Sequence, residues 1–314
     1  MPDRETAVSG RTGARSRHRT RGRLALGLAL GVLLGGGVFV TASGQAGASD
    51  AIGATAPSTA PVTAPTAKRT STPTPTPAPT VAAKVAAPPR TRTGHSVTLT
   101  AAQQPAQVGA LFAGGIASGH HCTASVVDSP AGDVIVTAAH CLSSGASSHV
   151  FVPAYRDGKA PYGVWKISQV LEDDAWTSDR DPDHDVAFAL VEPLHGQTLQ
   201  SVVGGYGLDT GGTADTTVQI TGYPTSTDEP ISCTGSSRSF TGTQLTVYCT
   251  GYADGTSGSG WVEGYDPATG TGTLIGVIGG YQTGGDTEDV SYAAAFGADA
   301  RTLYDQAVTA SSAG

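Results

Sequence analysis

Residues 255–261 read Gly-Thr-Ser-Gly-Ser-Gly-Trp, and this stretch decides how the rest of the chain is interpreted. Glycines on both sides of Ser257 allow tight or left-handed turns, which would leave its hydroxyl uncovered. In such a turn the amides of Gly255 and Ser257 could point together at a developing oxyanion. A Gly/Ser-rich surface turn would give the same string. The stretch therefore indicates a nucleophile only if a base and an acid accompany it.

Two upstream segments supply a candidate base and a candidate acid. His140 stands in the string Thr-Ala-Ala-His-Cys at residues 137–141, directly after an apolar run at 134–136. Asp185 stands directly before the apolar run 186–190. The order along the chain is therefore His, Asp, Ser, which differs from the order in subtilisins and in α/β-hydrolases.

Taken together, these three segments resemble the trypsin-like serine endopeptidases of the chymotrypsin fold, most closely the secreted bacterial branch that includes glutamyl endopeptidase-like enzymes. The resemblance covers roughly residues 105–310. It implies that Ser257 is the nucleophile, His140 the general base and Asp185 the acid that orients the histidine. It also implies an oxyanion hole formed by the amides of Gly255 and Ser257.

Other residues compete for these roles. Ser259 lacks the Gly-x pair that precedes Ser257. Three acids precede Asp185 at alternate positions, but none is followed by an apolar strand: Asp179, Asp181 and Asp183. This acidic run lacks the central glycine and distal glutamate of an EF-hand, so we expect a solvated loop. Four further histidines are expected at the surface: His120, His121, His184 and His195.

The four cysteines all lie in the C-terminal two thirds of the chain. An even number beside an export signal indicates two disulfides. The resemblance implies the pairs Cys122–Cys141 and Cys233–Cys249, the first of which would clamp the histidine loop. No cysteine pair has the spacing of a metal site. We expect neither a metal nor a cofactor.

The side-chain specificity stays open. By resemblance, the substrate pocket involves Gly251, Asp254, Ile278, Gly279, Gly280 and Tyr281. Gly251 stands where trypsin-like preference for Arg or Lys needs a carboxylate, although Asp254 is near. Ile278 stands where Glu-specific relatives have a histidine. Tyr281 follows where a small residue often lines the pocket, so we expect a shallow pocket.

Thr256 is a second departure from the resembled digestive enzymes, which have an acid directly before the serine to bind a newly cut N-terminus. Thr256 carries no charge, so activation by N-terminal insertion is unsupported. We expect local hydrogen bonds and packing to hold the oxyanion hole instead. Residues 91–103 are expected to be exposed chain that tolerates truncation.

The chain is not uniform along its length. Residues 1–48 are rich in arginine and contain an apolar stretch at 24–40, which indicates a signal peptide cleaved after Ala48 or an uncleaved signal anchor. Residues 49–93 are rich in Pro, Thr and Ala, which is typical of a disordered linker or a pro-segment.

Residues 94–314 carry six Lys/Arg against 23 Asp/Glu, a formal charge of −17 that argues against nucleic-acid binding. Short apolar runs separated by turn residues predict an all-β fold of two antiparallel six-stranded β-barrels. The barrels would span about residues 105–195 and 215–297. Apolar residues at helical spacing predict a short C-terminal helix at about 298–309.

We therefore expect an extracellular serine endopeptidase that cleaves proteins or peptides through an acyl-enzyme. It would act as a monomer, either secreted or tethered to a membrane through residues 24–40. Two alternatives stay open. The domain could be a catalytically weak, protease-like binding module at the cell surface, or an esterase that uses the same triad.

Overall fold

A computed structural model of the chain describes residues 93–212 and 214–313. The expected signal segment at 1–48 and nearly all of the expected linker at 49–93 lie outside the described residues. Within the described part, no helix is long and apolar enough to cross a membrane.

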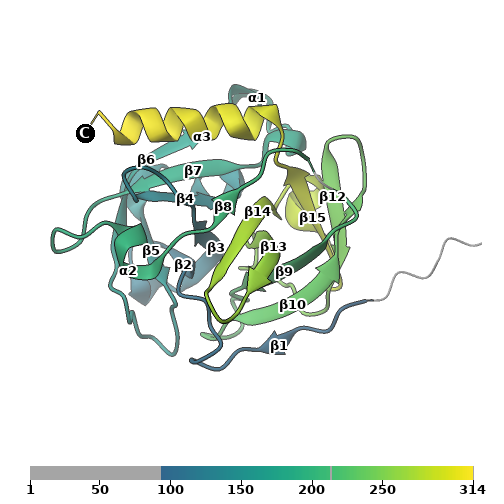
Figure 1. Cartoon of the computed structure of the whole chain (residues 1–314), viewed down its shortest axis with the longest axis horizontal. Helices are drawn as coiled ribbons and strands as arrows, with labels where there is room; N and C mark the ends of the chain where they lie inside the picture. The colour runs from purple at the N-terminus through teal and green to yellow at the C-terminus, as the bar shows by residue number, and fades with distance from the viewer. Residues whose placement is uncertain (1–92, 213, 314) are drawn as a thin grey trace, which may run out of the picture. The chain divides into compact units, whose positions relative to one another are not determined.

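The first half of the described chain forms a closed antiparallel barrel of six strands, in the order β2-β3-β4-β7-β6-β5 (Figure 1). The strands are β2 (Val108–Ala113), β3 (His120–Val126), β4 (Val134–Thr137), β5 (His149–Pro153), β6 (Trp165–Glu172) and β7 (Ala187–Val191). Most of them coincide with apolar runs that predict strands in the sequence. The expected first barrel is confirmed.

Most strands of this barrel are buried on both faces, although β6 exposes Lys166, Ser168 and Gln169. In β7, Ala187 and Ala189 face the barrel interior, whereas Phe188 and Leu190 belong to a second cluster that reaches the other barrel and the C-terminal helix. This double burial explains the continuous apolar run. At Gly109 in β2, an added Cβ would lie 2.6 Å from the Phe151 ring, so only glycine leaves room for that aromatic side chain.

The second half forms a curled sheet of nine strands, in the order β1-β10-β9-β13-β14-β15-β12-β11, with β8 parallel to β14. The strands are β1 (Val97–Thr98), β8 (Gly207–Leu208), β9 (Thr217–Gly222), β10 (Ile231–Ser236), β11 (Arg238–Ser239), β12 (Gln244–Tyr248), β13 (Gly260–Asp266), β14 (Thr271–Ile278) and β15 (Val290–Ala295). The six longer strands correspond to the expected second barrel. The two-residue strands β1 and β11 extend its two edges by pairing with β10 and β12, and β8 pairs with Thr273 and Leu274 of β14, an inner strand of the path.

A disulfide joins the two ends of that six-strand path. Cys233 lies in β10 and Cys249 directly follows β12, and the two are bonded. β10 and β12 are the first and last strands of the path. The disulfide therefore links strands that no ladder pairs, and it holds the sheet in its curled form around a core that includes Ile220, Val247 and Trp261.

The helices are short except for the last one. They are α1 (Asp174–Asp179), α2 (Leu199–Val203) and α3 (Ala298–Ser311), with single 3₁₀ turns η1 (Ile116–Ser118), η2 (Ala139–Leu142), η3 (Ala146–Ser148), η4 (Pro182–His184) and η5 (Tyr281–Gly284). The terminal helix α3, yellow in Figure 1, lies over β6 and β7. It buries Ala300, Leu303 and Ala307, the residues whose spacing predicts it.

The segment 94–99 is bound to the second sheet. The Gly94 N–H donates to the Tyr248 carbonyl at 2.8 Å, and the Leu99 N–H donates to the Pro230 carbonyl at 2.9 Å. Between them, β1 pairs with β10. The expectation of exposed chain holds for Val97 and Thr98. Main-chain hydrogen bonds nevertheless fix residues 94–99 at an edge of the sheet, and tolerance of truncation over 91–103 stays a prediction.

Candidate active site

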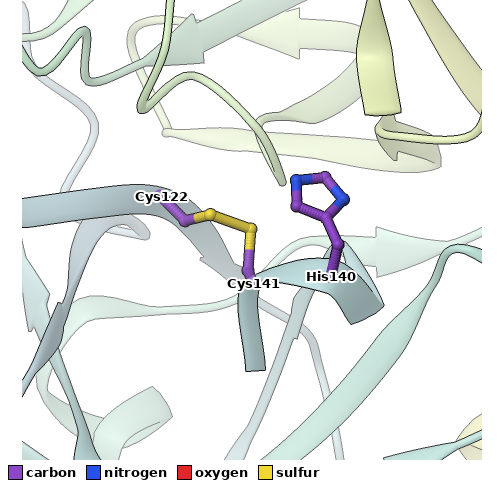
Figure 2. A group of neighbouring side chains, drawn as sticks. All are labelled: Cys122, His140 and Cys141. Atoms are coloured by element: carbon purple, nitrogen blue, oxygen red, sulfur yellow. A yellow bond between two sulfur atoms is a disulfide. The ribbon is translucent and has the colours of Figure 1, made fainter. Parts of the chain in front are cut away.

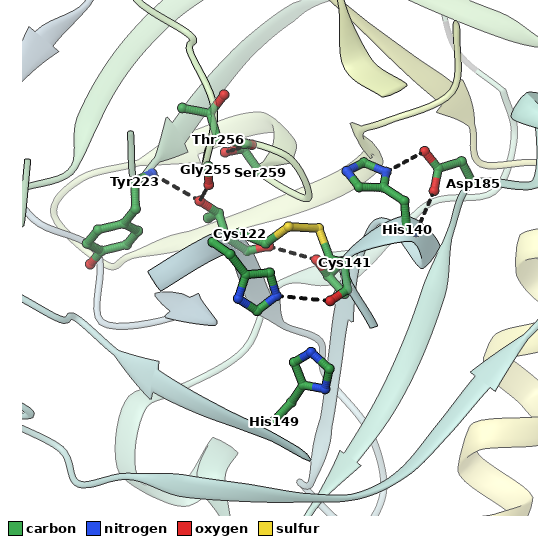
Figure 3. The surroundings of a disulfide bond; sticks show 12 residues. Cys122, His140, Cys141, His149, Asp185, Tyr223, Gly255, Thr256 and Ser259 are labelled. Atoms are coloured by element: carbon green, nitrogen blue, oxygen red, sulfur yellow. Dashed lines mark hydrogen bonds and ion pairs between the residues drawn. A yellow bond between two sulfur atoms is a disulfide. The ribbon is translucent and has the colours of Figure 1, made fainter. Parts of the chain in front are cut away.

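His140 and Asp185 lie together because the strands that lead to them are paired. β4 ends at Thr137 opposite Ala187 of β7, which puts the turn η2 with His140 next to the start of β7. The His140 N–H donates to Asp185 Oδ1 at 2.9 Å, and His140 Nδ1 lies 2.8 Å from Asp185 Oδ2 (Figure 3).

Asp185 is fully buried, and a buried charge needs hydrogen-bond donors. It has a third one, the N–H of Gly280, at 2.9 Å from Oδ2. Because a carboxylate only accepts hydrogen bonds, the neutral histidine must carry its proton on Nδ1. The Nε2 atom of His140 is then left as a hydrogen-bond acceptor, the form that a general base requires.

The Cys122–Cys141 disulfide clamps the turn that carries His140 (Figure 2). The two sulfurs and a ring nitrogen of His140 lie within 4.8 Å of one another, so three potential metal-ligand atoms are close together. The sulfurs are bonded to each other, however, so neither is a thiolate ligand. The group stabilises the loop, and it does not bind a metal in this form.

Ser257 lies in a turn that is fixed to both barrels. Its carbonyl accepts a hydrogen bond from the Thr123 N–H at 2.8 Å, in β3 of the first barrel. The next N–H, that of Gly258, donates to the Ile278 carbonyl at 2.7 Å, in β14 of the second. Gly258 has φ +79°, and a Cβ there would lie 3.1 Å from the Ala138 nitrogen. The serine turn is therefore packed against the segment that leads to His140.

Ser259, the rival nucleophile, is fully buried. Its hydroxyl donates to the Thr256 carbonyl at 2.7 Å, and its own N–H donates to the same carbonyl at 3.0 Å. Ser257 is partly exposed instead. The geometry gives Ser259 a structural task, and of the two serines only Ser257 is partly exposed.

Two peptide units beside Ser257 are held in fixed orientations. The Asp254 carbonyl accepts from the Thr225 N–H at 2.8 Å, and the Thr256 carbonyl is bound by Ser259. In a trans peptide the N–H points opposite to the carbonyl. The N–H groups of Gly255 and Ser257 therefore point away from these partners. Across residues 93–212 and 214–313, no hydrogen bond uses either N–H.

Gly255 can be replaced by no other residue without strain. Its φ is +92°, in the left-handed region, and a Cβ there would lie 2.8 Å from the Thr225 nitrogen. The neighbouring Thr256 is almost fully buried, and its hydroxyl donates to the Ala253 carbonyl at 2.8 Å. These local contacts hold the turn without a charged group at position 256.

A cavity of about 340 Å³ adjoins Ser257. Of the residues expected to form the pocket, Asp254 and Ile278 line it. Its lining also includes Tyr252, whose pKa is raised by burial, and two acids that carry no sequence motif: Asp286 and Glu288. These acids could not be identified from the sequence because they belong to a loop of small polar residues with no fixed spacing from the serine.

The other four expected pocket residues lie elsewhere in the described structure. Gly280 donates to Asp185, and a Cβ at Gly279 would lie 2.9 Å from Asp185 Oδ2, so both support the acid. Gly251 faces Ser96 of the N-terminal segment. Tyr281 is exposed, and its ring packs against two other aromatic rings, those of Phe240 and Tyr292. Its side chain therefore does not reduce the depth of the cavity.

The family model described as Trypsin matches residues 94–293. The chain belongs to the trypsin family. It is accordingly a serine endopeptidase, a hydrolase whose substrates are proteins or peptides. No curated protein sequence matches the chain significantly.

Solved structures of proteases share the fold. The protease Anisep from Arthrobacter nicotinovorans is 24% identical, with a TM-score of 0.58 over 68% of this chain and 99% of its own. The thermostable serine protease AL20, from an extremophilic microorganism, is 26% identical, with a TM-score of 0.57 over 66% and 99%. A Glu endopeptidase is 16% identical, with a TM-score of 0.54 over 69% and 98%.

The histidines near the site of this trypsin-family chain are not all at the surface. His120 is buried among aromatic rings, and His184 pairs with Asp173 at 3.2 Å. Burial is the main cause that lowers the pKa of His121, and the nearby histidines lower it further. A hydrogen bond to the Cys141 carbonyl acts in the opposite direction and raises that pKa. Of the four, His195 is exposed and His121 and His184 are partly exposed, so the surface expectation is wrong only for His120, which is buried among aromatic rings.

Proposed function

We propose that this chain is an extracellular endopeptidase that cleaves peptide bonds through Ser257, His140 and Asp185, with an acyl-enzyme intermediate. The observation that supports this most directly is the buried Asp185 carboxylate, which accepts from His140 Nδ1 at 2.8 Å and leaves Nε2 as an acceptor. The N–H groups of Gly255 and Ser257, to which no described residue offers an acceptor, add an anion-binding element beside the partly exposed serine.

The proposed reaction uses only groups of this chain and water. Ser257 Oγ attacks the substrate carbonyl carbon while its proton passes to His140 Nε2, and Asp185 stabilises the imidazolium. The carbonyl oxygen becomes an oxyanion that the N–H groups of Gly255 and Ser257 bind. Collapse of this intermediate breaks the C–N bond as His140 gives its proton to the leaving amine. Water then attacks the ester by the same route and releases Ser257.

The cavity beside Ser257 supports a preference for a cationic side chain at the cleaved bond. Three acids line it, Asp254, Asp286 and Glu288, and no Lys, Arg or His is among its lining residues. A carboxylate attracts an ammonium or guanidinium group and repels an acidic one. All three acids are exposed, so solvent and salt screen this attraction, and their number gives the preference. The same charges disfavour the Glu preference of one structural neighbour.

The proposed location outside the cell rests on the disulfides and the N-terminal sequence. Two disulfides in one domain indicate an oxidising compartment. An arginine-rich start followed by the apolar stretch 24–40 is typical of export, with cleavage or retention as a tether. One chain contributes all three proposed catalytic residues, so a monomer is sufficient for activity.

Labelling with a fluorophosphonate probe tests the proposed mechanism. We expect covalent labelling of the folded protein, mapped to Ser257 by peptide sequencing, and none in Ser257→Ala. Folded protein that is never labelled would contradict the proposal and favour a binding module. Faster turnover of a short-chain nitrophenyl ester than of casein would favour an esterase.

A cleavage-site profile on a denatured proteome tests the proposed preference separately. We expect Lys and Arg to be enriched on the N-terminal side of the cleaved bond. Asp286→Asn with Glu288→Gln should reduce that enrichment while probe labelling persists. Cleavage after Glu or after apolar residues by the parent protein would refute the role of these acids without touching the triad.

A further inference from the structure

We propose that Gln244 is a positioning residue for Asp185 and His140, acting through a bridge between the loop that carries Asp185 and the turn that donates to it. This inference rests on the proposed catalytic role of Asp185. Gln244 is the first residue of β12 and is not among the residues that line the cavity beside Ser257.

The Gln244 side chain is buried, with 4% of the residue exposed, and both ends of its amide are bonded. Nε2 donates to Asp183 Oδ1 at 2.6 Å, and Oε1 accepts from the Tyr281 N–H at 2.8 Å. A carboxylate can only accept and a backbone N–H can only donate, so these partners fix the orientation of the amide. Among side chains of this length, only glutamine offers one donor and one acceptor in this geometry.

Both partners of Gln244 are close to Asp185 along the chain or through one hydrogen bond. Asp183 lies two residues before Asp185, inside the single turn η4. Tyr281 directly follows Gly280, whose N–H donates to Asp185 Oδ2 at 2.9 Å. Asp185, Asp183, Gln244, Tyr281 and Gly280 therefore form a closed ring of covalent and hydrogen-bonded links around the carboxylate.

The ring has little slack at Gly280. Its φ is +78°, and an added Cβ would lie 3.0 Å from Gln244 Oε1 and 3.2 Å from the Pro182 carbonyl. The loop before Asp185, the turn after β14 and the Gln244 amide are thus in direct contact. Loss of the amide would leave the Tyr281 N–H without its acceptor and would free the Gly280 N–H to move relative to Asp185.

A set of four variants tests this bridge. Gln244→Glu faces the Asp183 carboxylate with a second carboxylate, so the donor is lost and the two repel. Asp183→Asn keeps an acceptor oxygen for Gln244, and the Thr243 hydroxyl that donates to Asp183 at 2.7 Å can accept instead. The double variant, Asp183→Asn with Gln244→Glu, exchanges the two roles: the new amide at position 183 donates to the new carboxylate at position 244, which still accepts from Tyr281. Gln244→Met removes both bonds and keeps the length.

Because the bridge does not contact the cavity, we expect an effect on kcat and not on KM. Small misplacement of a catalytic group costs up to about 100-fold in rate. Gln244→Glu and Gln244→Met should lower kcat and probe labelling by about 10-fold to 100-fold, with KM within about threefold. Asp183→Asn and the double variant should stay within about threefold of the parent in both constants.

The outcomes separate this inference from the proposed function. Folded Gln244→Glu and Gln244→Met with parental kcat, or a change in KM alone, would overturn the bridge. A folded double variant whose kcat stays as low as that of Gln244→Glu would also overturn the bridge. If the parent protein has no turnover, the triad proposal fails. The downfield proton resonance of His140 Nδ1–H then tests the bridge alone: it should shift or broaden in Gln244→Met and return in the double variant, and no change would contradict it.

Discussion

Thr123 lies where the two barrels meet, and its hydroxyl connects the proposed oxyanion hole to both. It is fully buried in β3, directly after the disulfide residue Cys122. Its Oγ1 accepts from the Tyr223 N–H at 2.9 Å and donates to the Gly255 carbonyl at 3.0 Å. Thr123→Val keeps the shape of the side chain and removes both hydrogen bonds. We expect this substitution to lower both the free energy of unfolding and the turnover rate, because it loosens the proposed oxyanion hole.

The magnitude follows from the two partners that remain. The Tyr223 N–H and the Gly255 carbonyl would stay buried without this partner, at about 1–3 kcal/mol for each unsatisfied group. We expect the free energy of unfolding to fall by about 2–6 kcal/mol, which lowers Tm by about 4–24 °C for a domain of this size. Loss of an oxyanion donor costs about 100-fold to 1,000-fold. Thr123 only fixes the peptide next to that donor, so we expect kcat to fall by about 10-fold.

Urea unfolding and turnover of a peptide substrate measure these two effects. Thr123→Ser is the matched control, because it keeps the hydroxyl and loses only a methyl group, worth about 1 kcal/mol. We expect its kcat to equal that of the parent protein. If Thr123→Val were as stable as Thr123→Ser and turned over substrate at the parental rate, the hydroxyl would have no part in holding Gly255.

Ser259→Ala removes one buried hydrogen bond, so we expect the free energy of unfolding to fall by about 1 kcal/mol and casein turnover to stay within about 10-fold of the parent. Ser257→Ala should lower the turnover rate by about four to six orders of magnitude. The reverse ranking of the two variants would exchange the roles of the two serines. Removing the Cys233–Cys249 disulfide by a double Ala substitution should cost about 3 kcal/mol, because it closes a loop of 16 residues. An unchanged urea midpoint in the double Ala variant would contradict a stabilising role of this disulfide. Burial lowers the pKa of His121 in the folded state, so the unfolded state binds a proton on this histidine more readily. The free energy of unfolding should therefore decline as the pH falls from about 6.5 through the lower pKa of the folded state. His121→Gln should flatten this dependence in urea unfolding between about pH 7 and 5, and an unchanged slope would remove His121 as its cause.

The strands that could be predicted from the sequence are those whose own residues are apolar. The runs at 134–136 and 274–278 became β4 and β14, because apolar side chains on successive residues are buried on both faces. β10 reads Ile-Ser-Cys-Thr-Gly-Ser and has no such run. It is a strand because β9 pairs with it along its full length. The short strands β1 and β11 depend still more on their partners, so no local pattern could indicate them.

The same distinction applies to the site. His140, Asp185 and Ser257 could be proposed because each stands in a short motif and their order is informative. Gln244 and Thr123 stand in no motif, since their roles exist only through partners far along the chain. Gln244 bonds a residue 61 positions away, and Thr123 bonds one 132 positions away. Only the docking of the two barrels brings these groups together.

Thr256 shows how this chain can hold an oxyanion hole without a charge at that position. The peptide before Gly255 is fixed by the Thr225 N–H, and the peptide after Thr256 is fixed by Ser259. Thr123 ties the same turn to the first barrel. All of these bonds come from residues that are in place once the domain has folded. An inserted, newly cut N-terminus would find no carboxylate at position 256 to pair with. The N-terminal segment instead binds outside the second sheet at Gly94, where it stabilises the edge of that sheet. We therefore expect the proposed hole to require only that the two barrels dock, which folding alone would supply.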